Sequence, residues 1–224
     1  MKSVLLSVQP KWCELIASGN KTVEVRKTKP KIDVPFKCYI YMTKDKWYKD
    51  YKNKCHYGNG KVIGEFVCQA ILNYECEFVD DDCYESIASI LIDEDGDKTG
   101  FIEWSNDGDI PYKDTFFYKT SRIGYGELKK YMGVGFGTFY GWHISNLVIY
   151  DKPKELGEFY RYTDYDDSKK DKRPCYCCEY NSFDYSENCE YCSIDYDGEH
   201  CIHLQIKRPP QSWCYVERKE DEGK

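Results

Sequence analysis

The chain has 224 residues, a net charge of −7 and an unusual aromatic content, with 22 Tyr, 10 Phe and 5 Trp. This length is enough for one generous domain, or for a core domain with an appendage. Because no apolar run reaches the length of a membrane-spanning helix or of a signal peptide, we expect a soluble cytoplasmic protein without a membrane partner. The negative charge argues against indiscriminate binding to nucleic acid.

The charge is distributed unevenly along the chain. Residues 1–67 hold 14 Lys and Arg against 6 Asp and Glu, whereas residues 74–114 hold 14 acidic residues against two lysines. The acidic part would repel a long phosphate backbone, while the basic part can still hold a short one. This distribution favours selective binding of a nucleotide or a short single strand over coating of a duplex. A merely solubilising surface explains it equally well.

The N-terminal half is predicted to consist mainly of strands. Pro10 opens a short helix with Trp12, Leu15 and Ile16 on one face, and Gly19 ends it. The elements predicted here, in chain order, are a buried strand at 2–8, that helix, a strand at 21–27, a half-buried strand at 36–43, a loop at 44–59 and a central strand at 61–72 with Gly64 at a bulge or close approach.

The rest of the chain mixes strands with short helices, including one expected near residues 84–91. The later predicted elements are a helix at 124–132, a strand at 139–150, a turn or short helix from 152, and closing strands at 202–206 and 213–217. Many strands with few short helices predict an α+β, mainly β fold, a small mixed or barrel-like domain.

Residues 19–26, Gly-Asn-Lys-Thr-Val-Glu-Val-Arg, are the most informative stretch. On a strand, the two valines would be buried while Glu24 and Arg26 project from the other face. Lys21, at the start of the strand, can lean to either side. These three charges could converge on a pocket for a polar, partly anionic ligand. A solvated strand face with one weak salt bridge is the alternative, and from the residues alone it is the commoner one.

A cysteine cluster near the C-terminus has the spacing of a zinc site. Two Cys-x-x-Cys pairs are separated by ten residues, and four thiolates around a tetrahedral ion leave no open position, so we expect a structural Zn²⁺. The predicted ligands are Cys175, Cys178, Cys189 and Cys192. The reserve ligands are Cys177, His200, Cys201 and His203. Iron would also suit thiolates, and reduced thiols in a loop are the alternative.

Several motifs together resemble the ASCH domain family. Residues 4–10 (Val-Leu-Leu-Ser-Val-Gln-Pro), 19–26 and 60–66 (Gly-Lys-Val-Ile-Gly-Glu-Phe) carry the resemblance. Residues 139–144 and 208–216 are similar to a subgroup typical of bacteriophages and their Gram-positive hosts, in which a cysteine-rich insert often precedes the last motif. The resemblance covers most of the chain apart from the acidic region.

The resemblance implies a PUA-like β-barrel with a ligand cleft between the barrel and the first helix, akin to folds that take up a flipped modified base. The ligand-binding residues that it implies are Trp12, Lys21, Glu24, Arg26, Trp142 and His143, with Trp213 as a further candidate for an aromatic wall. The expected ligand is RNA or a (modified) nucleotide or nucleoside. The implied division is a barrel at 1–160 with an acidic insertion at about 74–114, a zinc-binding insert at 161–201, closing strands at 202–218 and a flexible tail at 219–224.

The resemblance also raises two enzymatic alternatives. Small bacterial ASCH members remove acetyl from N4-acetylcytidine with a Lys, a Thr three residues later and a Glu. Lys21 matches that Lys, Glu24 stands at the Thr position, and no residue matches the catalytic Glu. Lys21 and Glu24 are therefore candidate catalytic residues in a different mechanism, in which Glu24 activates water and Lys21 polarises a carbonyl. Other members are associated with ribonuclease activity, which His143 beside Lys21 would suit, although a lone strand histidine is more often structural.

A third alternative is a phage-encoded protein that binds a host factor, in the host cytoplasm. Its motivation is the acidic region and the zinc-binding insert, which a minimal ASCH domain lacks.

Overall fold

A computed structural model describes residues 2–45, 48–49, 55–56, 58–78, 85–92, 97–161 and 205–217. The strands are β1 (Ser3–Val8), β2 (Val23–Arg26), β3 (Phe36–Met42), β4 (Tyr48–Lys49), β5 (Cys55–His56), β6 (Val62–Phe78), β7 (Ser86–Ile92), β8 (Lys98–Ser105), β9 (Gly135–Lys154), β10 (Tyr160–Arg161) and β11 (Trp213–Glu217). The helices are α1 (Pro10–Ala17), α2 (Phe116–Ser121) and α3 (Tyr125–Met132), with 3₁₀ turns η1 (Tyr112–Asp114) and η2 (Leu156–Glu158).

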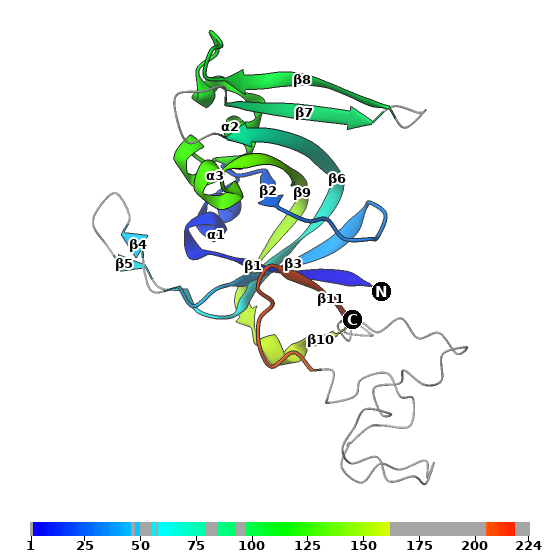
Figure 1. Ribbon diagram of the computed structural model, residues 1–224. Coiled ribbons are helices and arrows are strands. Elements are labelled where there is room, and N and C mark those ends of the chain that lie inside the picture. The colour runs from blue at the N-terminus through cyan, green and yellow to red at the C-terminus, as the bar shows by residue number, and fades with distance from the viewer. Residues whose placement is uncertain are drawn as a thin grey trace, which may run out of the picture.

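Nine of the described strands form one mixed sheet, in the order β10-β11-β1-β3-β6-β7-β8, with β9 paired to both β6 and β2. Only the β1–β3 pair is parallel among these strands. Figure 1 shows β6 and β9 running through the middle of the molecule, with β7 and β8 beyond one end and β10 and β11 at the other. The prediction of a mainly β fold with short helices is confirmed.

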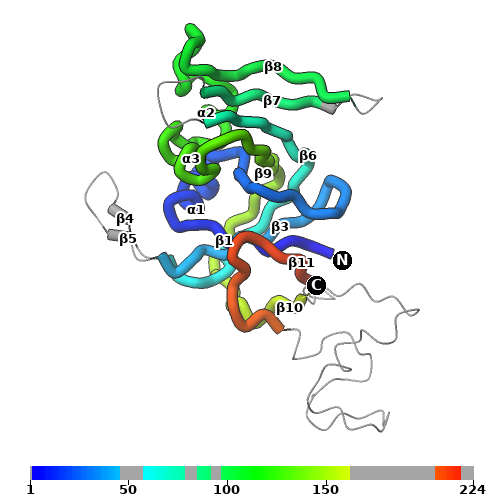
Figure 2. The backbone as a smooth tube through the Cα atoms, in the orientation of Figure 1, coloured from blue at the N-terminus to red at the C-terminus, as the bar shows by residue number. Residues whose placement is uncertain are grey.

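The predicted closed barrel is wrong, because the described part of the sheet is open. Its path ends at β8 on one side and at β10 on the other, and β2 pairs with β9 alone. The reason is the length of β6, which has 17 residues and changes partners along them. Its first half pairs with β3 and its second half with β7, so the sheet bends and splays instead of closing (Figure 2).

The helix predicted near residues 84–91 is also wrong, since β7 covers this segment. Residues 86–92 are Ser-Ile-Ala-Ser-Ile-Leu-Ile, a composition rich in β-branched residues. They pair with β6 on one side and β8 on the other. Pairing with the neighbouring strands on both sides therefore fixes this part of the acidic region as a strand. The helix α2 was not predicted.

Three packed clusters form the core. In β1, Val4, Leu6 and Val8 face the cluster that contains α1, while Leu5 faces a second cluster with Phe159. The third cluster joins α2 and α3 to the distal half of β6. Because both faces of the β1–β3 layer are covered, the predicted half-buried strand at 36–43 is in fact buried on both faces, and Tyr39 and Tyr41 are only 3% exposed.

The close approach predicted at Gly64 is confirmed. A Cβ atom at this position would lie 2.4 Å from the carbonyl oxygen of Val148 on β9. Glycine therefore allows β6 and β9 to pair at this point. Within the described residues, no helix is long and apolar enough to cross a membrane.

The predicted zinc ligands Cys175, Cys178, Cys189 and Cys192, and their reserves, lie outside the described residues. Among the residues that are described, no group of three or more His, Cys, Asp or Glu side chains is arranged to hold a metal ion.

Candidate functional site

The strand β2 places its charged residues inside the molecule rather than on a solvated face. Gly19, with φ +73°, turns the chain at the end of α1, and the backbone N–H of Lys21 donates to Leu15 O at 2.9 Å. β2 then pairs with β9, so that Glu24 stands opposite Trp142. All four residues of β2 are buried, which removes the interpretation of a solvated strand face.

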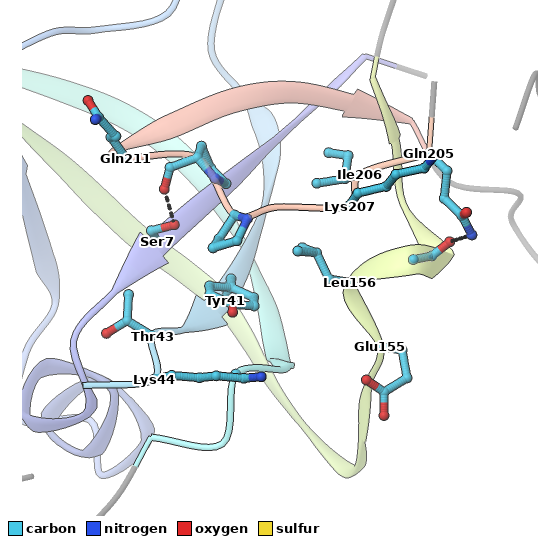
Figure 3. A pocket seen from close by; sticks show the side chains of 14 residues that line it. Ser7, Tyr41, Thr43, Lys44, Glu155, Leu156, Gln205, Ile206, Lys207 and Gln211 are labelled. Atoms are coloured by element: carbon cyan, nitrogen blue, oxygen red, sulfur yellow. Dashed lines mark hydrogen bonds between the residues drawn. The ribbon is translucent and has the colours of Figure 1, made fainter. Parts of the chain in front are cut away.

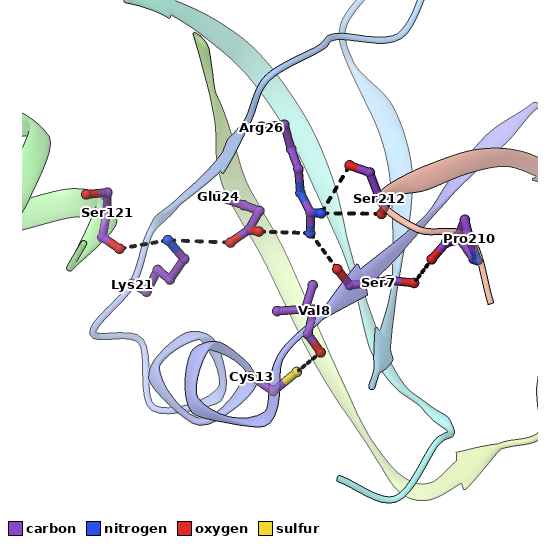
Figure 4. Close-up of polar contacts among 9 residues, drawn as sticks. All are labelled: Ser7, Val8, Cys13, Lys21, Glu24, Arg26, Ser121, Pro210 and Ser212. Atoms are coloured by element: carbon purple, nitrogen blue, oxygen red, sulfur yellow. Dashed lines mark hydrogen bonds and ion pairs between the residues drawn. The ribbon is translucent and has the colours of Figure 1, made fainter. Parts of the chain in front are cut away.

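Lys21, Glu24 and Arg26 form a continuous ionic network (Figure 4). The Glu24 carboxylate lies between the two cations, with Oε2 at 3.4 Å from Lys21 Nζ and Oε1 at 2.9 Å from Arg26 Nη2. Lys21 Nζ also donates to the carbonyl of Ser121, at the end of α2, at 2.7 Å. The predicted convergence of these three side chains is therefore present in the structure.

Arg26 links this network to the segment that precedes β11. Its Nη2 donates to Ser7 O at 2.9 Å, and its Nη1 lies 3.3 Å from both the carbonyl and the hydroxyl oxygen of Ser212. Ser7 Oγ in turn donates to Pro210 O at 2.6 Å. The closing motif at 208–216 is thus fastened to β1 and β2. The buried Nε of Arg26 has no hydrogen-bond partner in the described part of the chain.

Burial sets the electrostatics of the site. The Lys21 side chain is 1% exposed, and this burial lowers the pKa of its ammonium group, an effect that the nearby Glu24 carboxylate opposes. Removal from water disfavours a charge unless a counter-charge lies close by. The single carboxylate of Glu24 is therefore the group that allows two cations to be buried here.

These side chains line a cavity of about 690 Å³ between α1, β2 and α3, with Gln211 at its edge. This volume lies in the range of small-molecule sites. The lining residues are Ser7, Val8, Gln9, Trp12, Lys21, Glu24, Val25, Arg26, Thr43, Asp45, Ile123, Glu127, Lys130, Tyr131 and Gln211. A donor, an acceptor and the indole of Trp12 thus line one partly open cavity.

Four of the predicted ligand-binding residues, Trp12, Lys21, Glu24 and Arg26, line the cavity, and Trp142 and His143 do not. Trp142 is fully buried in the core. His143 Nδ1 lies 3.0 Å from the hydroxyl of Ser145, its neighbour on β9. As ligand contacts, Trp142 and His143 stay predictions.

Trp213, the further wall candidate, is also absent from the cavity lining. Its ring centroid lies 5.9 Å from that of Trp142, and its Nε1 donates to Thr28 Oγ1 at 3.0 Å.

Cys13, on α1, donates from Sγ to Val8 O at 3.5 Å, and burial raises the pKa of its thiol. The buried Cys13 therefore packs as a small apolar group.

Sequence reasoning missed the wall that α3 contributes. Glu127, Lys130 and Tyr131 line the cavity, and their spacing of three and four residues places them on one face of a helix. That spacing was a usable signal, because the helix at 124–132 had been predicted. The role of Ser121 carried no such signal, since α2 was not expected and its contact with Lys21 spans 100 residues.

The fold and the site together define a class of protein: a mainly β domain with a charged cavity beside its first helix. Residues 6–96 match the family model of the ASCH domain, a segment that includes the motifs at 19–26 and 60–66. The ASCH resemblance is therefore confirmed over this segment. No curated protein matches the chain.

Two solved structures from Zymomonas mobilis are similar to the chain at a distant level. The crystal structure of ASCH from this organism is 16% identical, with a TM-score of 0.41, over 69% of this chain and 73% of that one. A point mutant of ZmASCH is also 16% identical, with a TM-score of 0.40, over 70% of this chain and 77% of that one.

Proposed function

We propose that the cavity beside α1 binds a nucleotide or an exposed base of RNA. The observation that carries this proposal is the buried Glu24 carboxylate, held between Lys21 and Arg26 in the wall of a cavity of about 690 Å³. Such a site offers charged hydrogen-bonding groups in a space that restricts water, where they discriminate strongly between ligands.

The unused hydrogen-bonding capacity of the site fits the edge of a base. The Glu24 oxygens can each accept a further hydrogen bond, for example from an exocyclic amine. Lys21 has three N–H donors, of which Ser121 O and Glu24 engage two within the described residues. The third can meet a carbonyl oxygen of a base.

Trp12 supplies a flat apolar surface in the cavity wall, on which a base can stack. Lys11 Nζ lies 4.3 Å from the centroid of the Trp12 ring. Lys21 Nζ lies 5.0 Å from the same centroid. The side chain of Lys11 is 42% exposed and pairs with Glu127, and this exposed ion pair costs little to break when a base approaches.

Titration with nucleosides, nucleoside monophosphates and short RNAs, followed by calorimetry, tests the proposal. Lys21→Met keeps the length of the side chain and removes its donors, so we expect about tenfold or greater loss of affinity. Lys113→Gln is the control, because Lys113 is exposed and lies outside the cavity lining. Equal affinity in the wild type, Lys21→Met and Arg26→Ala, all with intact thermal unfolding transitions, refutes the assignment.

A second candidate function is hydrolysis of a modified nucleoside. It is favoured by the lowered pKa of Lys21 beside a carboxylate at 3.4 Å, since perturbed ionisable groups in cavities are typical of catalytic sites. Glu24 would take a proton from water while the water oxygen attacks an acyl carbonyl polarised by Lys21. The carbon–nitrogen bond then breaks, and the products are an acid and the free amine. Turnover of acylated cytidine that disappears in Glu24→Gln supports this function, and absence of turnover across a nucleoside panel ends it.

The predictions that concern the phage subgroup, the structural Zn²⁺ and a host-protein partner depend on the insert at 161–201. Four thiolates at Cys175, Cys178, Cys189 and Cys192 would stabilise a segment too polar to order itself by burial. Native mass spectrometry of the intact protein measures the bound metal directly. A mass without a metal ion after purification under reducing conditions contradicts the zinc proposal.

A further inference from the structure

A second cavity adjoins the first. It has a volume of about 830 Å³ and lies between β3, η2 and the segment at 205–211 (Figure 3). The lining residues are Ser7, Tyr41, Thr43, Lys44, Gly60, Glu155, Leu156, Gly157, Gln205, Ile206, Lys207, Pro209, Pro210 and Gln211. The function proposed above does not use this space.

The two cavities meet at a common wall formed by Ser7, Thr43 and Gln211, which line both. Figure 3 shows these three residues on one side of the second cavity, with Gln205 on the other. A ligand long enough to extend across these three residues would contact both cavities.

The common wall is held in place by several hydrogen bonds. Ser7 N donates to Ser212 O at 2.9 Å, and Ser7 Oγ donates to Pro210 O at 2.6 Å. Arg26 Nη2 donates to Ser7 O at 2.9 Å from the side of the first cavity. The residues shared by the two cavities are therefore held in fixed positions, in part by the same Arg26 that contacts Glu24.

The second cavity has two lysines in a lining that is otherwise largely apolar or neutral. Lys44 and Lys207 are exposed, and neither has an ion-pair partner among the described residues. The acid in the lining, Glu155, is paired with Lys61. The remaining charge of the cavity is therefore positive.

The position of Lys44 is restricted by Gly60. A Cβ atom at residue 60 would lie 2.2 Å from Cε of Lys44, and the φ of Gly60 is +67°. The aliphatic part of Lys44 therefore lies along a surface that only glycine leaves open, and the side chain extends across the cavity in Figure 3. Because Lys44 is already restricted, it loses less conformational entropy than a free lysine when it binds a phosphate.

We infer that the two cavities form one binding groove for single-stranded RNA. The base or nucleotide occupies the cavity beside α1, and the phosphates of the adjoining nucleotides lie along Lys44 and Lys207. This inference rests on the proposed function and adds the ligand class, a polymer rather than a free nucleotide. Two exposed cations without an ion-pair partner among the described residues suit a phosphodiester backbone, which is recognised by charge rather than by sequence.

The test compares a nucleoside monophosphate with a single-stranded RNA of about five nucleotides, a length suited to such grooves, by calorimetry at several salt concentrations. We expect the RNA to bind more tightly than the monophosphate. In Lys44→Gln/Lys207→Gln, affinity for the RNA should fall about tenfold at low salt, and affinity for the monophosphate should not change. The slope of log affinity against log salt should become shallower by about 1.4.

Lys113→Gln/Lys152→Gln removes the same charge from exposed positions outside both cavities and is the matched control. Equal affinity for monophosphate and RNA, or an equal loss in the two double variants, overturns the inference while leaving the proposed function intact. If neither ligand binds the wild type, the proposed function itself fails, and the inference fails with it.

Discussion

Two buried carboxylates, Glu24 and Glu103, lie in different regions of the molecule and are buried to nearly the same extent, at 6% and 5% exposure. Glu24 contacts two cations. Glu103 instead accepts from the backbone N–H of Phe117 at 2.7 Å and from the hydroxyl of Ser89. One carboxylate balances charge, and the other satisfies neutral donors.

Burial of an acid therefore does not by itself identify a binding site. Glu103 holds the first turn of α2 against β8 and lines neither cavity. The two lysines at the end of α3 differ in the same respect. Lys129 forms an ion pair with Glu85, whereas Lys130 lines the cavity that contains Glu24. A carboxylate with cationic neighbours and open space beside it is the feature that marks the functional region.

Glu24→Ala should have the largest effect, a loss of about 3–5 kcal/mol in the free energy of unfolding, because it leaves two buried cations without a counter-charge. Chemical denaturation measures this loss. Asp114→Ala, which removes an exposed partner of Lys119, is the control and should cost less than about 1 kcal/mol. Similar stabilities of the two variants would mean that the Glu24 network does not stabilise the fold.

Glu103→Gln should cost about 1.5–3 kcal/mol, since the amide replaces hydrogen bonds to a charged acceptor by weaker ones. Nucleotide affinity should be unchanged, whereas Glu24→Gln should weaken it. Calorimetry on both variants, at a temperature where each is folded, separates the two regions. A loss of affinity in Glu103→Gln equal to that in Glu24→Gln would mean that Glu103 also supports the binding site.

Local sequence patterns were sufficient for much of the fold. The short helix after Pro10, the long central strand with Gly64 and the closing strand at 213–217 could all be predicted, because periodicity, proline and glycine act over a few residues. The strand β7 and the open sheet could not. They depend on how far β6 extends and which partners it takes, and two of these partners, β3 and β9, are distant in the sequence.

The residues of the candidate site could also be predicted from local patterns, but their burial could not. Alternation along β2 placed Glu24 and Arg26 on one face, but it could not tell a solvated face from a buried one. The burial comes from residues far away in the sequence, as in the contact between Arg26 and Ser212, which spans 186 residues. The side chains were therefore identified from the pattern, and their enclosure required the fold.

The lowered pKa of Lys21 predicts that the stability of the protein depends on pH in the alkaline range. Burial lowers this pKa in the folded state from the ordinary value of 10.5. Between the lowered value and 10.5, the unfolded chain holds a proton that the folded protein lacks, so stability rises with pH, by at most about 1.4 kcal/mol per unit.

Denaturation of the wild type and of Lys21→Met across this range measures the effect. The stability of the wild type relative to the variant should increase as pH approaches 10.5 and then level off. Buried thiols such as Cys68, whose pKa burial raises to about 12, destabilise both proteins alike at high pH and cancel in the difference. A flat or falling difference would contradict the burial of a charged Lys21.

Lys130→Gln should have the smallest effect, a loss of less than about 1 kcal/mol in the binding of a nucleoside monophosphate, because an exposed cation at the cavity edge is screened by water and salt. Stability should not change, since Lys130 has no ion-pair partner among the described residues. The loss should disappear for a nucleoside without phosphate and at high salt, and Lys113→Gln should show none of it. An equal loss for nucleoside and monophosphate would contradict this prediction and would assign Lys130 to the base rather than to the phosphate.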